Sequence, residues 1–335
     1  MKAYRVISDA GLPDALEATE LPDPAPGPGE VVVAVKAASL NYRDLIITKG
    51  GYPRNDTRPV VPLSDAAGVV ADVGAGVTKW KPGDRVTPNF MRDFLAGEPN
   101  EAALSSGLGG SIDGVLAQRV VLPEASLVRT PDHLTDDQAA TLPCAAVTAF
   151  NALDAAGTTA GDTLLLLGTG GVSIFALQLA KARGATVILT SSSDDKLEKA
   201  KALGADHTVN YRRHPEWQDR VREITDGRGV DHVVEVGGPG TFDRSLQSVR
   251  VGGTVSLIGL LSEGQPNIIA ALLQSATIRG IYVGSVDLFN RMNRTITAHR
   301  IEPVIDRTFP FDHALDAYHH LASQKHMGKV VINEF

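Results

Sequence analysis

The chain has 335 residues, which leaves room for about two domains at roughly 150 residues each. Hydrophobic residues make up 43% and charged residues 21%, with 33 glycines and 19 prolines, so the composition excludes a disordered chain, a collagen-like fibre and a coiled coil. The formal net charge of −7 disfavours nucleic acid and anionic membranes as partners.

The cysteine content and the distribution of apolar residues indicate the cellular compartment of the protein. The single cysteine, Cys144, excludes an intramolecular disulfide and a four-cysteine zinc site. Residues 1–17 lack the apolar run of a secretory signal. The uncharged window Thr163–Ala180 contains three glycines and several polar residues, a composition unsuited to a membrane span. We therefore expect a soluble, cytoplasmic protein with no membrane partner.

The first 144 residues are rich in Val, Pro and Gly, and short strand-like pieces are separated by turn signals. The expected strands are Val31–Val35, Gly68–Val73, Arg85–Thr87, Leu116–Leu122 and Leu127–Arg129. The segment Met91–Ser111 fits no regular pattern and is expected to be a surface excursion. Residues 1–144 are thus predicted to form a β-rich, partly closed sheet domain.

From about residue 145, expected strands alternate with expected helices. The strands are Thr163–Leu167, Thr186–Thr190, His207–Val209, Asp231–Val236, Thr254–Ile258 and Ile278–Val283. Ser192 and Asp195 are spaced like a capping box ahead of the second helix. Alternation predicts a parallel sheet, and six strands make two βαβαβ halves of a doubly wound α/β domain over residues 145–283. Residues 284–335 return to a mixed pattern, with a helix near His313–Leu321.

A glycine-rich turn lies between the first expected strand of this domain and its helix. It reads Gly168-Thr169-Gly170-Gly171-Val172-Ser173. Gly168 permits a tight turn, and Gly170 lets the backbone approach a pyrophosphate at the helix N-terminus. Ser173 replaces the usual third glycine but is small enough for close helix packing. The turn predicts dinucleotide binding, and a methyltransferase is the rival use of such a turn.

The end of the second expected strand bears on which dinucleotide binds. An NAD site usually places an acidic residue about twenty residues beyond the glycines. Here the chain has Ser191, Ser192 and Ser193 instead, which supply hydroxyl donors and no carboxylate. The missing acidic residue also counts against a methyltransferase, because methyltransferases commonly hold their ribose with a carboxylate. Residues expected near enough to meet a 2′-phosphate are Lys196, Tyr211 and Arg212. We therefore favour NADP(H) over NAD(H). The alternative is that the serines only cap the next helix and that Asp194 or Asp195 holds the ribose.

Several further motifs resemble those of the medium-chain dehydrogenase/reductase superfamily. They are Lys81-Pro82-Gly83-Asp84-Arg85-Val86, Leu142-Pro143-Cys144-Ala145 leading to Thr148-Ala149-Phe150, and the glycine-rich turn. The resemblance covers nearly the whole chain. It implies a GroES-like catalytic domain, a Rossmann domain, a cofactor cleft between them and a C-terminal segment that rejoins the first domain.

The zinc ligands of alcohol dehydrogenases in that superfamily are mostly missing. Asn41 stands at the position of the early cysteine, Ser64-Asp65 stands at the His-Glu position, and only the later cysteine survives, as Cys144. One thiolate and one carboxylate cannot form a three-ligand zinc site. The chain resembles the zinc-free branch, with its quinone oxidoreductases and enoyl reductases, and uncharacterised zinc-type alcohol dehydrogenase-like proteins. We expect no metal, and we expect Cys144 to be a buried apolar residue.

Without metal, hydride transfer needs hydrogen-bond donors or a general acid for the enolate charge. The resemblance implies that Tyr52 is the proton donor, that Asn41 contacts the nicotinamide ribose and that Thr148 lies near the nicotinamide ring. Tyr42 and Asp65 are further catalytic candidates. The alternatives are a turn aromatic for Tyr52 and helix capping for Asn41, Thr148 and Asp65.

Backbone at the carboxyl ends of the later strands is expected to flank the nicotinamide half, because ligands bind there in open parallel sheets. The residues are Gly237, Gly259, Val283 and Gly284, and the resemblance adds Lys329 near the C-terminus.

The sequence thus predicts a zinc-independent, NADP(H)-dependent oxidoreductase that transfers hydride to a quinone or an α,β-unsaturated carbonyl. The first alternative is a metal-free alcohol dehydrogenase or carbonyl reductase. The second is a non-catalytic nucleotide-binding protein, a role that lens crystallins of this superfamily illustrate. The expected partners are a small-molecule acceptor and a second copy of the chain in a homodimer.

Overall fold

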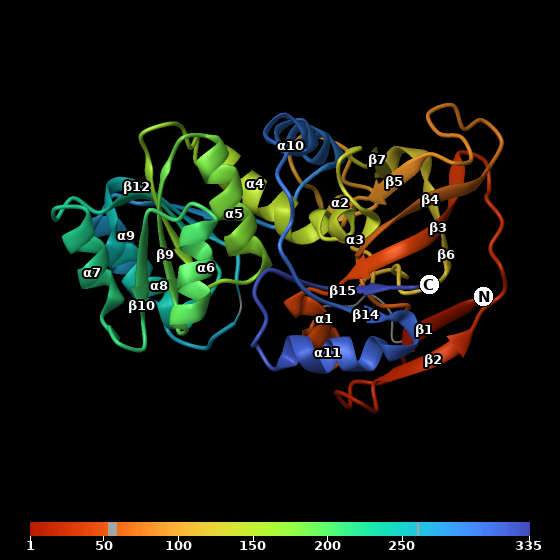
Figure 1. Ribbon diagram of the computed structural model, residues 1–335, viewed down its shortest axis with the longest axis horizontal. Helices are drawn as coiled ribbons and strands as arrows, with labels where there is room; N and C mark the ends of the chain where they lie inside the picture. Colours follow the sequence, from red (N-terminus) through yellow and green to blue (C-terminus); the bar gives the residue numbers. More distant parts are fainter. Residues whose placement is uncertain (53–58, 260) are drawn as a thin grey trace. The chain divides into compact units, whose positions relative to one another are not determined.

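The computed structural model describes residues 1–52, 59–259 and 261–335. The chain divides into two compact units. The first consists of Met1–Val147 together with Val283–Phe335, and the second of Thr148–Tyr282. Both ends of the chain therefore contribute to the first unit, as the red and blue ribbons of Figure 1 show.

The first unit contains a seven-stranded sheet and a small antiparallel pair. The pair is β1 (Lys2–Val6) with β2 (Leu16–Glu20). The sheet follows the order β14-β15-β3-β4-β5-β7, and β6 also pairs with β3. Its strands are β3 (Glu30–Ser39), β4 (Asp65–Val73), β5 (Arg85–Pro88), β6 (Arg119–Pro123), β7 (Leu127–Arg129), β14 (Ile305–Pro310) and β15 (Lys329–Asn333). This unit is β-rich, as the Val-rich and Pro-rich sequence predicts.

Helices and apolar strand faces enclose the core of the first unit. The α-helices are α1 (Tyr42–Ile47), α2 (Glu101–Leu104), α3 (Asp136–Ala139), α10 (Val286–His299) and α11 (Ala314–Ala322), and Leu142–Ala146 forms one turn of π-helix. Tyr318 and Leu321 of α11 pack in the same apolar cluster as Val330 and Ile332 of β15. The C-terminal segment thus belongs to this core.

The segment Met91–Ser111 departs from the expected surface excursion. It contains the short helix α2, and Met91, Phe94 and Leu108 are buried. Bridges join Met91 to Gly107 and Leu108 to Ile112. Apolar residues spaced irregularly along a loop give no periodic signal, and for this reason the sequence pattern did not predict their burial.

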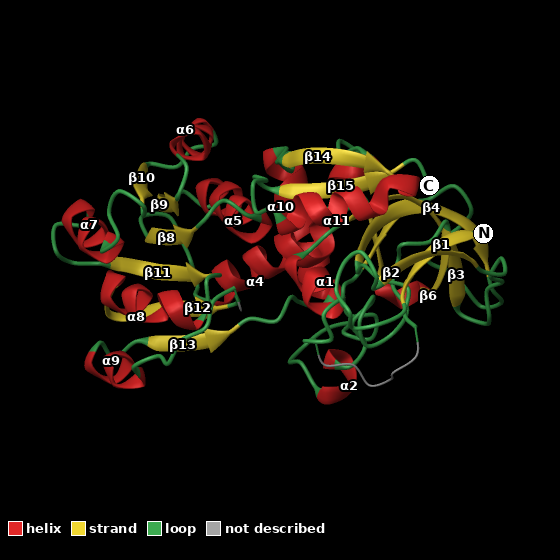
Figure 2. Cartoon of the chain, turned by 90° about the horizontal axis from the view of Figure 1, so that it is seen from below, coloured by secondary structure: helices red, strands yellow, loops and turns green. Residues whose placement is uncertain are grey.

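The second unit is a six-stranded parallel sheet in the order β10-β9-β8-β11-β12-β13, which is the doubly wound order (Figure 2). Its strands are β8 (Thr163–Leu167), β9 (Thr186–Ser191), β10 (His207–Asn210), β11 (Val230–Glu235), β12 (Val249–Leu257) and β13 (Thr277–Gly280). Its helices are α4 (Val147–Ala155, whose first residue lies in the first unit), α5 (Gly171–Ala182), α6 (Asp194–Ala202), α7 (Trp217–Ile224), α8 (Pro239–Ser248) and α9 (Ile268–Leu273). The six strands and the α/β class are as predicted.

Several element boundaries differ from the prediction. Ser193, not Ser192, caps α6, because its hydroxyl accepts the Lys196 backbone N–H at 3.4 Å. Strand β13 ends at Gly280, three residues earlier than expected, because its pairing with β12 stops where Gly280 lies opposite Leu257.

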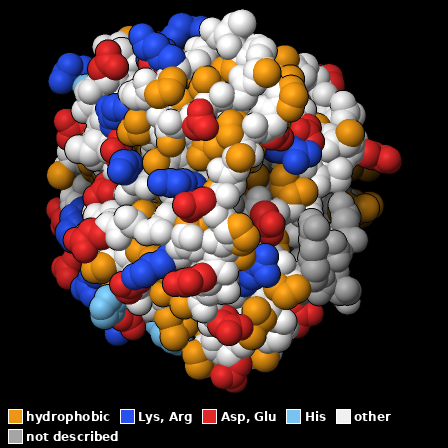
Figure 3. All heavy atoms as spheres, turned by 90° about the vertical axis from the view of Figure 1, so that its right-hand side faces the viewer, with side chains coloured by type: hydrophobic (Ala, Val, Ile, Leu, Met, Phe, Trp, Pro, Cys, Tyr) orange, Lys and Arg blue, Asp and Glu red, His pale blue; other side chains and the backbone are white. Residues whose placement is uncertain are grey.

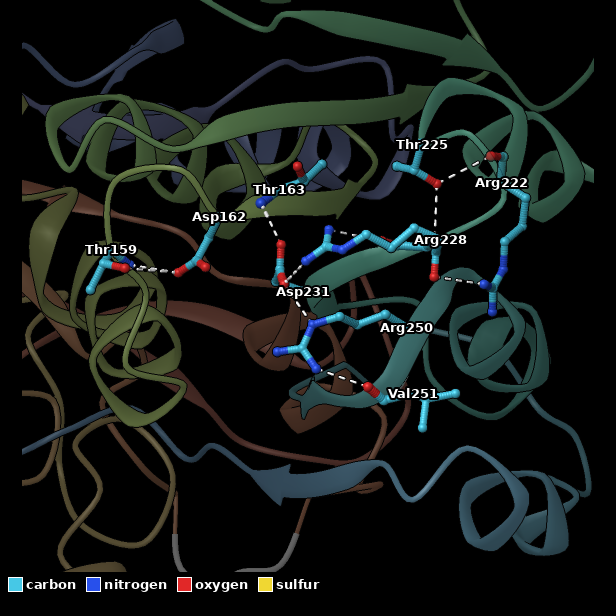
Figure 4. Close-up of polar contacts among 10 residues, drawn as sticks. Thr159, Asp162, Thr163, Arg222, Thr225, Arg228, Asp231, Arg250 and Val251 are labelled. Atoms are coloured by element: carbon cyan, nitrogen blue, oxygen red, sulfur yellow. Dashed lines mark hydrogen bonds and ion pairs between the residues drawn. The ribbon is translucent and has the colours of Figure 1, made fainter.

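Asp231, at the start of β11, ties together three segments of the second unit (Figure 4). Its carboxylate accepts the Thr163 N–H at 2.9 Å and the Arg250 Nε–H at 2.6 Å, and it also pairs with Arg228. Burial opposes the charge, but these hydrogen bonds hold the pKa of Asp231 below its ordinary value. This network lies at the amino ends of β8 and β11, opposite the edge where ligands bind in such sheets.

Acidic and basic side chains are interspersed over the face of the first unit that Figure 3 presents. Among the described residues, no helix combines the length and the apolar character needed to cross a membrane.

Candidate active site

The glycine-rich turn connects β8 to α5 with the geometry of a phosphate cradle. Gly168 has φ = +75°, a conformation that favours glycine, and Gly170 is the N-cap of α5. A Cβ at Gly168 or Gly170 would meet nothing within 4 Å, so the backbone there faces open space. No side chain caps α5, and its first N–H groups can therefore receive a phosphate. The other predicted contacts in this turn are Thr169, which is buried, and Gly171 and Val172 in the first turn of α5.

Ser173 shows why the third glycine can be absent from this turn. Its side chain is buried, and its hydroxyl donates to the Leu167 carbonyl at 2.6 Å. The small side chain therefore fits against the strand and also satisfies the last carbonyl of β8. The interpretation of Ser173 as a small packing residue is confirmed.

The ends of β9 and β10 bring together several residues predicted to hold a 2′-phosphate. Asn210 lies opposite Ser191 in the sheet, and the Tyr211 N–H donates to the Ser191 carbonyl at 3.1 Å. Ser192 follows directly, and Arg212 is exposed beside Tyr211. Lys196 lies in the first turn of α6. These residues belong to the same edge of one sheet.

Asp194 and Asp195, in the first turn of α6, are the alternative ribose ligands, and both oxygens of Asp194 are engaged. Oδ1 accepts Asn210 Nδ2 at 2.7 Å, and Oδ2 pairs with the Arg213 guanidinium. Asn210 Oδ1 in turn accepts the Arg212 N–H at 3.0 Å. Sequence reasoning missed Asn210 and Arg213, although Arg213 stands beside a predicted residue.

Glu235, which the sequence analysis did not select, organises the loop after β11. Its side chain is fully buried at the last position of the strand. Oε1 accepts the N–H groups of Gly237 and Gly238 at 2.7 and 2.9 Å and the Thr241 hydroxyl at 2.7 Å. Oε2 accepts the Ser245 hydroxyl. One carboxylate thus fixes the backbone of the predicted contact Gly237.

Gly259 is required by the close approach of two chain segments. A Cβ on Gly259 would lie 1.6 Å from the Val236 carbonyl oxygen, and the Gly259 N–H donates to the Glu235 carbonyl at 3.1 Å. Any side chain at this position would force β11 and β12 apart at their carboxyl ends.

Val283 and Gly284 come after the sixth strand of the second unit, in the segment where the chain returns to the first unit. They follow the end of β13 by three and four residues and belong to the first unit. The Gly284 carbonyl accepts Asn89 Nδ2 at 3.2 Å, and a Cβ on Gly284 would clash with Leu288. They still follow the carboxyl end of the sixth strand, but β13 itself ends at Gly280 and not at the expected Val283. Their contact with the nicotinamide half stays a prediction. Thr148 is buried in α4 of the second unit.

In the first unit, Asn41, Asp65 and Lys329 form one buried polar cluster. Lys329 Nζ donates to Asn41 Oδ1 at 2.5 Å and to the Leu40 carbonyl at 2.7 Å, and it lies 3.6 Å from Asp65 Oδ2. The exposed fractions are 3% for Lys329, 0% for Asp65 and 9% for Asn41. Asn41 also occupies the N-cap position of α1, where its backbone N–H donates to Asp44 Oδ2 at 2.7 Å.

Asp65 and Cys144 are neighbours in this cluster. Asp65 Oδ1 accepts the Ser64 hydroxyl at 2.7 Å, and Oδ2 accepts the Cys144 N–H at 3.1 Å. The Cys144 residue is half-buried. Burial of the thiol, and then the negative charge of Asp65, raise the pKa of Cys144 to about 12. Cys144 is thus a protonated thiol at neutral pH rather than a nucleophile.

Helix α1 carries Arg43, a further residue that the sequence analysis missed. Its guanidinium lies over the rings of Phe90 and Tyr52, 4.4 and 4.9 Å from their centroids, and Nη2 donates to the Leu108 carbonyl at 2.5 Å. The Tyr52 ring also packs against the apolar cluster that contains Ile47, as the turn-aromatic alternative requires. Tyr42, the neighbouring candidate, is 38% exposed.

These residues do not fit a zinc ion. A catalytic zinc needs three protein ligands, such as thiolates, imidazoles or carboxylates. The positions that supply them in zinc enzymes here hold an amide, a carboxylate and a protonated thiol, and the Lys329 ammonium already lies on two of them. Within the described ranges, no cluster of three His, Cys, Asp or Glu side chains could hold a metal.

Family models match both units. Residues 27–132 match the alcohol dehydrogenase GroES-like domain, and residues 171–298 match the zinc-binding dehydrogenase domain. A zinc-type alcohol dehydrogenase-like protein of Schizosaccharomyces pombe is 49% identical over 314 residues, 91% of each chain. An acryloyl-coenzyme A reductase of Metallosphaera sedula is 31% identical over 335 residues, 96% of this chain and 97% of the relative.

Solved structures agree with this relationship. A protein of Sinorhizobium meliloti 1021 classed as an alcohol dehydrogenase superposes with a TM-score of 0.91 at 39% identity, with 99% of each chain covered. An NAD-dependent alcohol dehydrogenase superposes with a TM-score of 0.91 at 34% identity, again over 99% of each chain. A mycobacterial protein in complex with NADPH has a TM-score of 0.84 at 29% identity, with 99% of this chain and 100% of that one covered.

The fold, the glycine-rich cradle and these relatives define a nicotinamide-dependent oxidoreductase with a GroES-like and a Rossmann-like domain. The chain belongs to the medium-chain dehydrogenase/reductase superfamily and, within it, to the family of zinc-type alcohol dehydrogenase-like proteins.

Proposed function

We propose that this protein is a zinc-independent, NADP(H)-dependent reductase that transfers hydride to a quinone or an α,β-unsaturated carbonyl. The observation that carries the proposal is the buried Lys329 ammonium, which contacts Asn41 and lies 3.6 Å from Asp65, at positions where zinc enzymes of the superfamily hold their metal. A second cation there would be repelled by the ammonium in a poorly solvated site. The acryloyl-coenzyme A reductase, whose name indicates a conjugated substrate, supports the acceptor class.

Zinc independence is tested by elemental analysis of protein purified without added metal, together with activity after chelation. We expect less than stoichiometric zinc and unchanged turnover. Stoichiometric zinc whose removal abolishes activity would refute this part of the proposal.

The preference for NADPH is supported by the end of β9. Asp194 is held by Asn210 and Arg213, so its carboxylate is engaged in the protein and does not offer the free acceptor that an NAD ribose requires. Lys196 and Arg212 can supply charge-assisted hydrogen bonds to a 2′-phosphate, each stabilising the complex by about 1.5–3 kcal/mol.

Calorimetric titration with NADPH and NADH tests this preference. In Lys196→Ala or Arg212→Ala, the ratio of the two dissociation constants should move toward NADH by about tenfold or more. The matched control is Arg220→Ala, which removes the same charge from α7, where Arg220 pairs with Glu223. Tighter binding of NADH than NADPH by the unmodified protein would contradict the preference.

The acceptor class follows from the donors that the first unit offers. Without a metal, an isolated ketone lacks strong activation, whereas a conjugated carbonyl spreads the developing charge. We propose Tyr52 as the proton donor, and Arg43 positions its ring. Steady-state rates with NADPH are measured for quinones, enones, aldehydes and ketones. Faster reduction of quinones or enones supports this proposal over a metal-free alcohol dehydrogenase or carbonyl reductase.

A metal-free alcohol dehydrogenase or carbonyl reductase is the second candidate, because several relatives carry alcohol dehydrogenase names. It predicts faster reduction of simple aldehydes and ketones than of enones in the same panel.

We also propose that the protein forms a homodimer through α9 and β13. Ile268, Ile269, Leu272 and Leu273 of α9 are between 57% and 78% exposed, and all residues of the edge strand β13 are exposed. An apolar helix beside an unpaired strand edge suits an isologous contact with a second copy. Light scattering should give twice the chain mass for the unmodified protein and the single mass for Leu272→Asp with Leu273→Asp. A monomeric unmodified protein would exclude this assembly.

A further inference from the structure

The Asn41 side chain has an amide hydrogen-bond donor that the protein itself leaves unused. Asn41 is 9% exposed, and in the part of the chain that the structure describes, its Nδ2 has no hydrogen-bond partner. A buried donor without a partner is destabilising, so its presence needs an explanation.

Lys329 fixes the orientation of this amide. A lysine ammonium only donates hydrogen bonds, so the atom 2.5 Å from Nζ must be the Asn41 oxygen, and Nδ2 must point away from Lys329. The ammonium is held in turn by the Leu40 carbonyl at 2.7 Å and lies near the Asp65 carboxylate. Gly328 sets the backbone from which Lys329 extends. It has φ = +75°, and a Cβ at this position would lie only 2.2 Å from the Val304 carbonyl oxygen.

The same contact makes the amide a stronger donor. A positive charge on Oδ1 draws electron density from the amide, and hydrogen bonds in series strengthen one another in a poorly solvated site. Lys329 therefore acts on a neighbouring molecule through Asn41 rather than directly, because its own ammonium is engaged with acceptors.

We propose that Asn41 Nδ2 donates to the carbonyl oxygen of the acceptor, with Lys329 as its positioning residue. The proposal rests on the proposed conjugated acceptor. The reduced nicotinamide supplies the hydride. As the hydride forms a C–H bond at the β-carbon, the C=C pair shifts toward the carbonyl and its oxygen gains the negative charge of an enolate. Asn41 stabilises that charge, and a proton from Tyr52 or water then completes the reduced acceptor.

Asn41→Asp is the sharpest test. Aspartate is as good an N-cap as asparagine, so α1 should be retained, but a carboxylate has no N–H to donate. The matched control is Asn290→Asp, on α10 of the same unit, where the amide bonds to the Val286 carbonyl one turn away. Thermal unfolding of both variants checks the fold.

The test has two readouts: the affinity for a probe molecule, which involves no turnover, and the rate with an enone. In the complex with NADP, p-nitrophenolate serves as a probe with an enolate-like oxygen, and nitrobenzene serves as its neutral partner. Asn41→Asp should weaken p-nitrophenolate binding at least about tenfold and leave the nitrobenzene dissociation constant unchanged. Turnover of an enone should fall about 100-fold. Lys329→Met, which frees the amide to rotate, should reduce phenolate affinity by a smaller factor.

The outcomes separate this inference from the proposed function. Unchanged phenolate affinity in Asn41→Asp overturns the inference, whatever the unmodified protein reduces. A weaker NADPH complex with unchanged phenolate binding also overturns it and assigns Asn41 to the cofactor. If the unmodified protein reduces neither enones nor quinones but loses phenolate affinity in Asn41→Asp, the donor role is supported and the proposed function fails.

Discussion

Replacing Glu235 should uncouple the loop after β11 from the rest of the second unit. Glu235→Ala removes the acceptor for the Gly237 and Gly238 N–H groups and for two hydroxyls. The Thr241 hydroxyl can keep the Gly238 carbonyl as a partner at 3.2 Å, so the two backbone donors dominate the loss. At about 1–3 kcal/mol for each buried donor left unpaired, we expect destabilisation of about 3 kcal/mol.

Glu235→Gln is the matched control for this prediction. The glutamine oxygen can accept the same three donors as Oε1, and its amide nitrogen can donate to the Ser245 hydroxyl. The charge disappears but the hydrogen bonds remain, so we expect a change below about 1 kcal/mol. Urea unfolding followed by fluorescence measures both variants.

Cofactor affinity gives a second readout of the same change. Gly237 is a predicted nicotinamide-side contact, and its loop must be ordered when the cofactor binds. If that ordering costs roughly 1.4 kcal/mol in Glu235→Ala, the NADPH dissociation constant rises about tenfold. Equal stability and equal affinity of the alanine and glutamine variants would refute the assignment of Glu235 as the organiser of this loop.

Three other predictions follow from individual side chains. Tyr52→Phe should keep NADPH affinity and lower enone turnover at least about tenfold, with a smaller effect on a quinone, and near-normal rates on both would leave Tyr52 as a turn aromatic. Asp231→Asn should destabilise the protein by about 2 kcal/mol at pH 7. Because the folded-state pKa of Asp231 is lowered, its contribution is present above the unfolded pKa of about 4 and is lost as the pH falls further, so the two proteins should converge in acid unfolding experiments; a constant difference would contradict the ion-pair explanation. Cys144, whose raised pKa keeps it protonated, should react with iodoacetamide at pH 7 more slowly than a free cysteine does, and a faster reaction would contradict the described environment.

The second unit could be predicted almost entirely from the sequence, because each strand, turn and helix leaves a local pattern. Thr163–Leu167 is an apolar run followed at once by glycines, and the structure begins and ends β8 there. The end of β13, expected at Val283 and found at Gly280, could not be predicted from the residues of that strand alone. Apolar residues continue past Gly280, but β12 ends at Leu257, so the paired register stops there and only the Ile281 N–H still donates to the Leu257 carbonyl, at 3.0 Å.

The buried polar cluster of Asn41, Asp65 and Lys329 could be predicted only in part from the sequence. Lys329 contacts Asn41 across 288 positions of the chain, because β15 pairs antiparallel with β3 at Val331 and Ser39. The resemblance to a family indicated that Lys329 matters, but no local spacing showed what its ammonium touches. Arg43 was missed for the same reason, since its partners, the Leu108 carbonyl and the Phe90 ring, are brought to it only by folding. Glu235 was missed although its partners lie within ten residues, because a single acidic residue at the end of a strand matches no motif.

The order in which the elements are synthesised constrains how the cluster can form. The second unit is one continuous segment, Thr148–Tyr282, so all of it is synthesised before β14 and β15. Domains generally fold as units during synthesis. Until β15 is synthesised, the first unit therefore cannot be complete. The part of β3 that later pairs with β15 stays without that partner, and Asn41 lacks its contact with the Lys329 ammonium. The protein acquires its dinucleotide cradle early and its buried lysine last, so a nascent chain stalled before residue 329 would have a complete cradle and no assembled polar cluster.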